Sequence, residues 1–321
     1  MPASPDAAIL RRLRAAGDGF TPAANLGEPA AVAGRVAVLE EAGYVIERHP
    51  RFGYRLRSTP DRLIADDILS RLPECRWIRD VVVFQRTGST NDVITSLARQ
   101  GAPQGVAAFA EEQTAGRGRL GRRWQSDPRL GLWFSILLRP DMPLALWPRL
   151  TLWIAYAVAR GIRRCAGVQI MLKWPNDLYA SGRKLAGILV ESSLGENAFA
   201  TAGIGLNVNH PSFPAPLDAT ATSLRIETGM AQDRNALAAA ILASIDQSFS
   251  LMPNHFPDIL SWASEADYLL GRWVSATAGS TTHEGFAQGL DPDGALRIRT
   301  AAGEVIRVNS GEVTKFSSIG G

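Results

Sequence analysis

The chain has 321 residues, of which 46% are hydrophobic and 20% are charged, and its formal net charge is +3 at pH 7. These values are typical of a soluble globular protein with a substantial core, and the length favours two or three domains. The sequence contains no internal repeat and no low-complexity segment, which excludes solenoid-like and compositionally disordered chains.

The cysteines and the apolar segments predict a cytoplasmic protein. Cys75 and Cys165 have neither metal-ligand nor disulfide spacing, and residues 1–17 lack the apolar core of a secretory signal. The longest apolar stretch, residues 144–162, is interrupted by arginines and a proline, which favours a buried helix over a membrane span. We therefore expect no membrane partner.

Residues 1–60 are predicted to form a small separate unit. Residues 6–16 are amphipathic and predict a helix, and residues 30–43 repeat apolar side chains at helical spacing and end at Gly43. Residues 44–57 contain short β-rich runs around a turn, which predicts a hairpin. Helices followed by such a hairpin favour a winged helix-turn-helix.

Residues 61–268 are predicted to form the central domain, after a connecting helix at 63–72. Strands are expected at 80–86, 105–113, 131–138, 168–174, 184–193 and 199–209, and helices at 88–101, 145–165, 233–251 and 255–267. Because hairpins dominate over alternating strand and helix, we expect an α+β fold with a mainly antiparallel sheet. Residues 269–321 contain short strands divided by Gly and Asp-Gly turns, which predicts a small β-barrel.

Residues 116–121 read GRGRLG and match the G-x-G-x-x-G phosphate fingerprint of dinucleotide-binding folds. That fingerprint needs a helix that opens at its last glycine, but Asp127 and Pro128 predict a loop, and residues 131–138 predict a strand. A mobile Arg-Gly loop between two strands is the better interpretation. On these residues alone, it is either a solvated basic loop or a loop that folds over an anion.

Only three of the 34 basic residues are lysines: Lys173, Lys184 and Lys315. In a chain that otherwise uses arginine, a lysine indicates a position where a compact point charge is needed in place of a planar fork. Residues 172–192 hold two of them and predict a hairpin that brings Asn176 and Asp177 near Lys184. The alternative is an ordinary turn with flanking charges.

Three spaced motifs resemble the biotin–protein ligase family. They are GRGRLGRRW at 116–124, KWPNDL at 173–178 and KLAGILVE at 184–191, and STN at 89–91 and Gln113 fit as well. The resemblance covers nearly the whole chain and is to the bifunctional ligase/repressor type. It implies a winged helix, a catalytic domain of the class II synthetase type and a C-terminal SH3-like barrel ending in SGEVTKF.

The resemblance implies a reaction in two steps. The carboxylate of biotin attacks the α-phosphate of ATP, which gives biotinyl-5′-AMP and pyrophosphate. A lysine of a biotin carboxyl carrier domain, as in acetyl-CoA carboxylase, then takes the biotin and releases AMP. Joining two anions needs cations at the point of attack and Mg²⁺ on the phosphates, and the sequence assigns no protein ligand to the metal.

The resemblance also implies residue roles. Lys184 would bridge the carboxylate and the α-phosphate, and Asp177 would either help hold the metal or accept a proton from the incoming lysine. Arg117 and Arg119 would close over the ligand. The implied biotin-binding residues are Ser89, Thr90, Asn91, Gln113, Gly116, Arg117, Gly118, Arg119, Lys184, Gly187 and Leu189. The implied ATP-binding residues are Arg117, Arg119, Trp124, Lys173, Asn176, Asp177, Lys184 and Asn207. For Trp124, stacking on adenine and packing in the core are equally open, and the hydroxyls of Ser89 and Thr90 are also candidates for capping a helix.

Operator DNA and a homodimer are further partners that the resemblance implies. Residues 1–60 contain eight arginines against six acids, so they carry no strong basic field. The presumed recognition helix offers Arg35 as its one good DNA-contacting group. The hairpin residues Arg48, Arg51 and Arg55 would reach only phosphates. Repression and a degenerate winged helix kept for structural reasons are both open. A ligand-sensing transcription factor and a lipoate ligase of the same fold are the other hypotheses.

Overall fold

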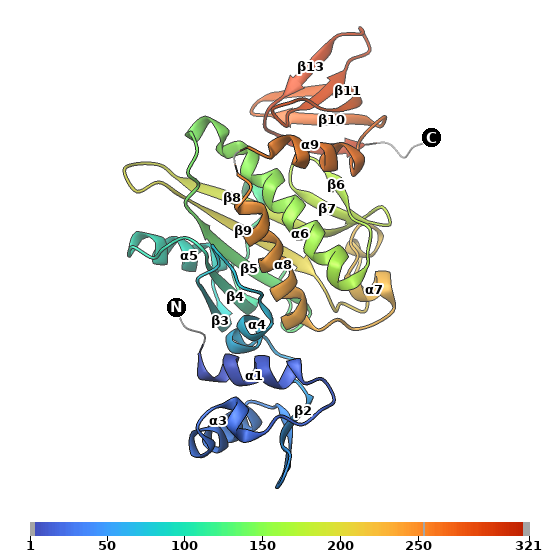
Figure 1. Cartoon of the computed structure of the whole chain (residues 1–321). Coiled ribbons are helices and arrows are strands. Elements are labelled where there is room, and N and C mark those ends of the chain that lie inside the picture. The colour runs from blue at the N-terminus through green and yellow to red at the C-terminus, as the bar shows by residue number, and fades with distance from the viewer. Residues whose placement is uncertain (1–3, 253, 317–321) are drawn as a thin grey trace.

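The structure is a computed structural model that describes residues 4–252 and 254–316. An N-terminal unit, a large central sheet with its helices and a C-terminal sheet lie one after another along the molecule (Figure 1). Residues 1–3 of the predicted first domain and residues 317–321 of the predicted last domain lie outside the described residues. The domain limits near 60 and 268 stay predictions.

The N-terminal unit packs helices against a hairpin. Its elements are α1 (Pro5–Ala15), α2 (Ala23–Leu26), α3 (Pro29–Glu41), β1 (Val45–His49) and β2 (Gly53–Ser58). Helix α1 begins where the Ser4 hydroxyl accepts the Ala7 N–H at 3.1 Å. Leu10 and Leu13 of α1 share one hydrophobic cluster with Val36 of α3. The predicted helices and hairpin are present, and their assignment as a winged helix-turn-helix stays a prediction.

A buried carboxylate joins this unit to the next helix, α4 (Ala65–Arg71). Asp67 is 0% exposed and accepts hydrogen bonds from Arg14 of α1 at 2.7 Å, Arg71 at 2.6 Å and the Tyr44 hydroxyl at 3.0 Å. Burial, and then the adjacent carboxylate, raise the pKa of Tyr44. Because a buried charge is strongly destabilising without its partners, this cluster holds α1 against α4.

Seven of the described strands form the central sheet, in the order β3-β4-β5-β9-β8-β7-β6. They are β3 (Asp80–Thr87), β4 (Val106–Gln113), β5 (Gly131–Leu138), β6 (Met171–Lys173), β7 (Asp177–Ala180), β8 (Arg183–Ser193) and β9 (Phe199–Asn207). Strands β3 and β4 run parallel, and every other neighbouring pair runs antiparallel. The prediction of an α+β fold with a mainly antiparallel sheet is confirmed.

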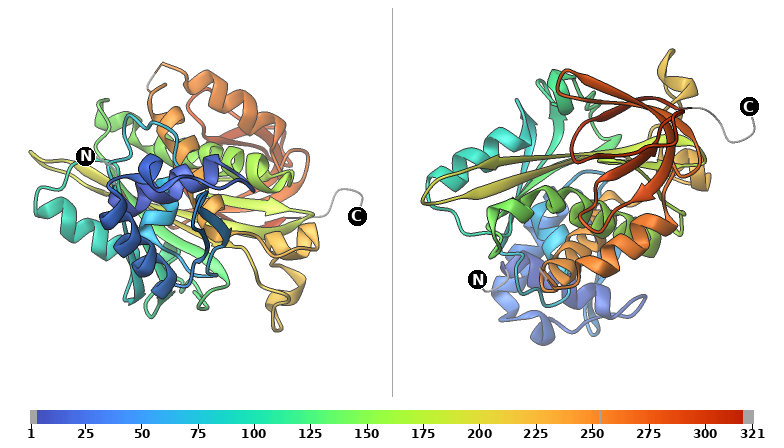
Figure 2. Two further views of the ribbon diagram at one scale, coloured as in Figure 1. Left: turned by 60° about the horizontal axis from the view of Figure 1, so that its bottom comes forward. Right: turned by 90° about the horizontal axis from the view of Figure 1, so that it is seen from above.

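Alternation along the strands gives the central sheet two different faces. On one face, Phe109, Ile136 and Ile204 join the main hydrophobic cluster under α6 (Leu150–Ala166) and α8 (Arg234–Phe249), which run side by side in Figures 1 and 2. On the other face, Ser135 of β5 stands in register with Gly203 of β9. Helix α5 (Thr90–Arg99) covers part of this second face, which carries the candidate site.

The remaining helical segments connect these layers. They are η1 (Arg119–Gly121), η2 (Leu144–Arg149), η3 (Leu217–Ala219), α7 (Leu224–Thr228) and α9 (Phe256–Glu265). The predicted helix over 145–165 is confirmed as α6, but its first turn is the separate 3₁₀ segment η2, which contains Pro148. No helix in the described parts of the chain combines the length and apolar character needed to cross a membrane.

Residues 172–192 form two successive hairpins, so the prediction of a single hairpin was wrong. Residues 174–176 turn the chain from β6 to β7, and Ser181 and Gly182 turn it from β7 to β8. Ser181 has φ 47 and Gly182 has φ 78, a left-handed pair that closes the second turn tightly. The extra strand β7 still places Asp177 beside β8, as the sequence indicated.

The C-terminal sheet is antiparallel in the order β13-β12-β11-β10-β14. Its strands are β10 (Trp273–Ala278), β11 (Thr281–Leu290), β12 (Leu296–Arg299), β13 (Val305–Val308) and β14 (Glu312–Phe316). Trp174, from the turn after β6, is buried in the cluster under this sheet and donates its indole N–H to the Gly294 carbonyl at 3.0 Å. This contact seats the C-terminal sheet at the edge of the candidate site, and its SH3-like character stays a prediction.

Candidate functional site

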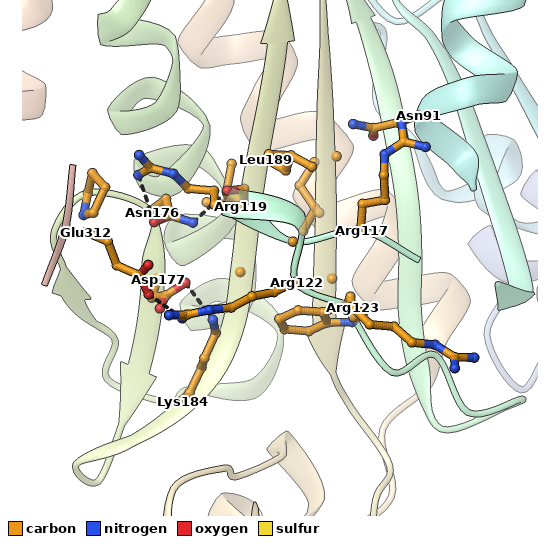
Figure 3. A pocket seen from close by; sticks show the side chains of 18 of the residues that line it. Asn91, Arg117, Arg119, Arg122, Arg123, Asn176, Asp177, Lys184, Leu189 and Glu312 are labelled. Atoms are coloured by element: carbon orange, nitrogen blue, oxygen red, sulfur yellow. Dashed lines mark hydrogen bonds and ion pairs between the residues drawn. The ribbon is translucent and has the colours of Figure 1, made fainter. Parts of the chain in front are cut away.

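A cavity lies on the second face of the central sheet, beneath the loop from β4 to β5 (Figure 3). It is lined by Ser89, Thr90, Asn91, Gln113, Arg117, Gly118, Arg119, Trp124, Lys173, Asn176, Asp177, Lys184, Gly187 and Leu189, among others. The cavity holds about 140 Å³. Sites for drug-sized ligands hold roughly 300–1,000 Å³. The cavity as it stands is therefore smaller than a site for a drug-sized ligand.

Lys184 and Asp177 form an ion pair at one end of the cavity. Lys184 Nζ lies 2.8 Å from Asp177 Oδ1, and the two side chains are 34% and 15% exposed. The backbone of Lys184 is fixed as well, because its N–H donates to Thr220 and its carbonyl accepts from Thr222. The site therefore presents an amine with rotatable N–H donors from a rigid strand.

The loop over the cavity is a tight turn. The Gly118 N–H donates to the Arg122 carbonyl at 2.7 Å, and the Trp124 N–H donates to the Gly116 carbonyl at 2.9 Å. At its tip, Arg119 reaches down and donates to Asn176 Oδ1 at 3.3 Å. Burial lowers the pKa of Arg119, and the charges of Asp177 and Glu312 oppose that shift. The loop thus brings a half-buried cation to the same end of the cavity as Lys184.

Trp124 forms the floor under the loop. Its indole lies so close to Gly205 that a Cβ atom there would stand 2.3 Å from Trp124 Cε2. The Lys184 amine lies 5.3 Å from the centre of the Trp124 ring, within the range of a cation–π contact. The ring therefore lines the cavity, although its buried indole N–H has no hydrogen-bond partner among the described residues.

Polar side chains form the other end of the cavity, at the start of α5. Gln113 Oε1 accepts the Thr90 N–H at 2.8 Å and the Thr90 hydroxyl at 3.1 Å, and Gln113 Nε2 donates to Ser126 at 3.0 Å. Gln113 therefore caps the helix, whereas the Ser89 side chain makes no capping hydrogen bond. Asn91 is buried here as well, at 4% exposure.

Two predicted residues lie outside this cavity. Gly116 is at the base of the loop, where its carbonyl accepts the Trp124 N–H. Asn207 is 7% exposed and donates to the Thr222 carbonyl at 3.0 Å, so it braces the segment that pairs with Lys184. Asn207 does not line the cavity, although the sequence predicts that it contacts the nucleotide. Lys173 does line the cavity, but its amine donates to the Val313 carbonyl at 3.1 Å, and burial lowers its pKa.

Several residues at the site were not predicted from the sequence. Glu312 of β14 lines the cavity and pairs with Arg122 of the loop, so the C-terminal sheet contributes directly. Glu191 accepts a hydrogen bond from the Asn91 amide, and Ser135 donates a hydrogen bond to the oxygen of the same amide. Glu191 ends the KLAGILVE motif, which is a signal that sequence reasoning had available. Ser135 gives no such signal, because it is one small residue in an apolar strand.

Comparison with known protein families assigns the chain with this cavity to the class of biotin and lipoate protein ligases. Residues 83–209 match the Biotin/lipoate A/B protein ligase family, and residues 269–315 match the Biotin protein ligase C terminal domain. Together these matches include the residues of the cavity and most of the C-terminal sheet, which lies beside the cavity.

Relatives over most of the chain narrow the assignment. The Bifunctional ligase/repressor BirA of Bacillus subtilis (strain 168) is 37% identical over 271 residues, covering 83% of this chain and 83% of that protein. The Biotin--[acetyl-CoA-carboxylase] ligase of Mycobacterium tuberculosis is 34% identical over 242 residues, covering 73% of this chain and 88% of that protein. The solved biotin protein ligase from Aquifex aeolicus in complex with biotin and ATP aligns with a TM-score of 0.65 at 30% identity, over 74% of this chain and 98% of that chain. This chain belongs to the biotin protein ligase family.

Proposed function

We propose that this chain is a biotin–[acetyl-CoA-carboxylase] ligase. It activates biotin with ATP to biotinyl-5′-AMP and transfers biotin to a lysine of a biotin carboxyl carrier domain, in the cytoplasm. The observation that carries the proposal is the single cavity that holds Lys184 and Arg119 at one end and Thr90, Asn91 and Gln113 at the other. A carboxylic acid with a polar head group fits a cavity that is cationic at one end and polar but uncharged at the other.

The cations at one end support adenylation. A carboxylate that approaches the α-phosphate of ATP is repelled until positive charge stands between them. Lys184 is held at that end by Asp177, and a ligand carboxylate and phosphate can take over the ammonium donors one at a time. Asp177 is then released either to accept a proton from the incoming carrier lysine or to contact the metal.

Arg119 supports retention of the adenylate. Its hydrogen bond to Asn176 forms part of the wall between the reaction cavity and a second cavity of about 680 Å³ beside η2 and the C-terminal sheet. Both Arg119 and Asn176 line the two cavities. With the loop closed, this wall excludes water from a hydrolysable mixed anhydride and closes its way out.

Mg²⁺ is proposed to arrive on the nucleotide. The described residues contain no cluster of three or more His, Cys, Asp or Glu side chains suited to a metal. The cavity carboxylates, Asp177 and Glu312, are each paired with a cation. This fits an ion that is held mainly by substrate phosphates and water, with at most one or two protein carboxylates. The metal would supply charge neutralisation on the phosphates.

The choice between biotin and lipoate is tested by mass spectrometry of a carrier domain. The purified chain is incubated with ATP, Mg²⁺ and either acid, with a carrier whose acceptor lysine is changed to arginine as the control. We expect the mass of biotin to be added to the native carrier alone, and no addition with lipoate. Attachment of lipoate without biotin contradicts the proposal.

Operator binding by a homodimer is a second candidate function, favoured by the repressor names of the relatives. Within the described residues, Arg35 of α3 pairs with Asp6, and Arg48 pairs with Glu40. Arg51 at the hairpin tip has no side-chain hydrogen bond or ion pair with a described residue. Gel retardation of the upstream DNA with and without biotin and ATP, at stated salt, tests this role. No retardation under any condition contradicts it.

A further inference from the structure

Asp92, Ser135 and Glu191 tie the loop over the cavity to the polar end of that cavity. None of them belongs to the proposed ligand-binding residues, and they come from α5, β5 and β8. Each contacts a residue that does line the cavity, either Arg117 on the loop or Asn91 at the start of α5.

On the loop side, Arg117 is held by two carboxylates. Its guanidinium donates to both oxygens of Asp92, each at 2.8 Å, and also to Glu191 Oε2 at 3.3 Å. A bidentate pair with a second carboxylate nearby is a stronger restraint than an isolated surface ion pair. The Asp92 and Glu191 side chains are 62% and 43% exposed, so the restraint is reversible and screened by salt.

On the cavity side, Glu191 fixes the orientation of the Asn91 amide. Asn91 Nδ2 donates to Glu191 Oε2 at 2.5 Å, and Asn91 Oδ1 accepts the Ser135 hydroxyl proton at 2.5 Å. A flipped amide would place Asn91 Oδ1 against Glu191 Oε2, which are both acceptors, whereas the Ser135 hydroxyl can accept as well as donate, so the Glu191 contact is the one that selects the orientation. Gly203 closes the space behind the amide, because a Cβ there would stand 2.2 Å from Asn91 Oδ1. The amide therefore has one allowed orientation.

The hydrogen-bonded chain returns to the loop. Because Ser135 gives its proton to Asn91, its oxygen is left to accept the Thr90 hydroxyl proton across a 2.7 Å contact, and Ser135 and Gln113 Oε1 share that one proton. Gln113 accepts the Thr90 N–H and donates to Ser126, which lies on the far side of the loop from Arg117. Both arms of the loop are thus connected through the side chains that form the polar end of the cavity.

We propose that Glu191 is a positioning residue that couples recognition of the ligand head group to closure of the loop, with Asp92 as the latch for Arg117. This rests on the proposed function, because the head group is that of biotin. The coupling is reciprocal: biotin at Asn91 favours the closed loop, and the closed loop strengthens biotin binding to the same extent.

Two substitutions at Glu191 separate its two contacts. Glu191→Gln keeps an oxygen that accepts from Asn91 but removes the charge that attracts Arg117. Glu191→Ala removes both. Asp92→Asn weakens only the latch. Glu196→Gln is the matched control, because Glu196 is exposed beyond the end of β8 and makes no hydrogen bond or ion pair with a described residue.

The measurements are the biotin dissociation constant by calorimetry and the rate of limited tryptic cleavage after the loop arginines, each in the full chain. We expect Asp92→Asn and Glu191→Gln to speed cleavage of the free protein while biotin affinity falls by less than about threefold. We expect Glu191→Ala to lower affinity by about tenfold or more, as for loss of a hydrogen bond to a charged group. In both Glu191 variants, protection of the loop by biotin should shrink.

Other outcomes would contradict either the coupling by Glu191 or the proposed ligase function. Native biotin affinity and native loop protection in Glu191→Ala would overturn the coupling while leaving the ligase function intact. A native protein that binds no biotin would instead overturn the proposed function. Altered cleavage in Glu196→Gln would show that loss of any carboxylate on this hairpin suffices, which also overturns the assignment to Glu191.

Discussion

Lys184 reaches Asp177 diagonally across two antiparallel strands. In register, Asp177 faces Gly187 and Lys184 faces Tyr179, with an irregularity between Leu178 and Tyr179. The 2.8 Å ion pair therefore depends on that irregularity and on a glycine opposite the carboxylate, which leaves the amine room to cross. The fold thus presents one positive and one negative group at the point where two anions would meet.

Replacing Lys184 with Ala is expected to reduce biotinyl-5′-AMP formation by at least about a hundredfold, because one charge at the point of attack is worth that much in comparable sites. Pyrophosphate release with biotin and ATP measures it. Lys315→Ala is the control, since Lys315 is exposed on β14 outside the cavity. Equal rates for both variants would remove Lys184 from the proposed role.

Replacing Arg119 with Gly is expected to let the adenylate escape faster, because it opens the wall to the second cavity. The released adenylate should then label lysines on bystander proteins. Quenched-flow measurement of adenylate release gives the rate. Arg129→Gly is the control, because Arg129 lies outside the cavity and its φ of 64 already suits glycine. An unchanged rate of adenylate release in Arg119→Gly would contradict the role of Arg119 in closing the cavity.

Replacing Gly203 with Ala is expected to abolish measurable biotin binding while the protein stays folded. The new methyl group would overlap Asn91 Oδ1. To move away, that oxygen would have to break its hydrogen bond with the Ser135 hydroxyl. Calorimetry with biotin measures the effect. Gly34→Ala in α3 has open space around it and should raise stability by about 0.5–1 kcal/mol without changing binding. Native affinity in Gly203→Ala would show that Asn91 is not at the ligand.

Replacing Asp67 with Ala is expected to destabilise the protein by about 3–5 kcal/mol, because it leaves Arg14 half-buried without its carboxylate and Arg71 with Asp233 alone. Urea denaturation measures the free energy of unfolding. Asp258→Ala, at an exposed pair with His255, is the control and should change it by less than about 0.5 kcal/mol. A small effect at Asp67 would mean that other contacts, such as those of Arg11 with the carbonyls of Leu69 and Ser70, hold the N-terminal unit in its place.

Asp267 makes stability depend on pH. Burial raises its pKa to about 6, from an ordinary value of 3.8. The native state therefore binds this proton more tightly than the unfolded chain, so its contribution to stability is complete below about pH 4 and is lost as pH rises through 6. Asp267→Asn should raise the free energy of unfolding at pH 7.5 by about 2–3 kcal/mol, and the gain should vanish near pH 4. A gain that is equal at both pH values would contradict the shift.

Much of the fold followed from local sequence signals. The strand at 131–138 and the helix over residues 234–249 are recognisable because alternation, helical spacing and flanking turn residues agree there. The short strand β7 escaped prediction because its four residues lie between two turns in one polar stretch. Helix α7, five residues long, has no periodicity to read.

The site was predictable where motifs place residues on one hairpin or one loop, as for Lys184, Asp177 and Arg119. It was not predictable where contacts join distant strands. Ser135 lies 44 positions from Asn91 in the chain, and Glu191 lies 100 positions away, and only the packing of α5 on the sheet brings them together. Asn207 lies outside the cavity and braces a neighbouring segment, a role to which a polar residue at a strand end is as suited as to binding a ligand, and its nucleotide contact stays a prediction.

One cavity of this chain is proposed to join biotin to a nucleotide. The most direct test of this proposal is native mass spectrometry of the purified chain after incubation with biotin, ATP and Mg²⁺, followed by removal of free ligands. The account predicts a retained mass equal to biotinyl-5′-AMP in the native chain, and little or none in Lys184→Ala. A native chain that retains biotin and ATP as separate, unreacted molecules, or retains neither, would contradict it.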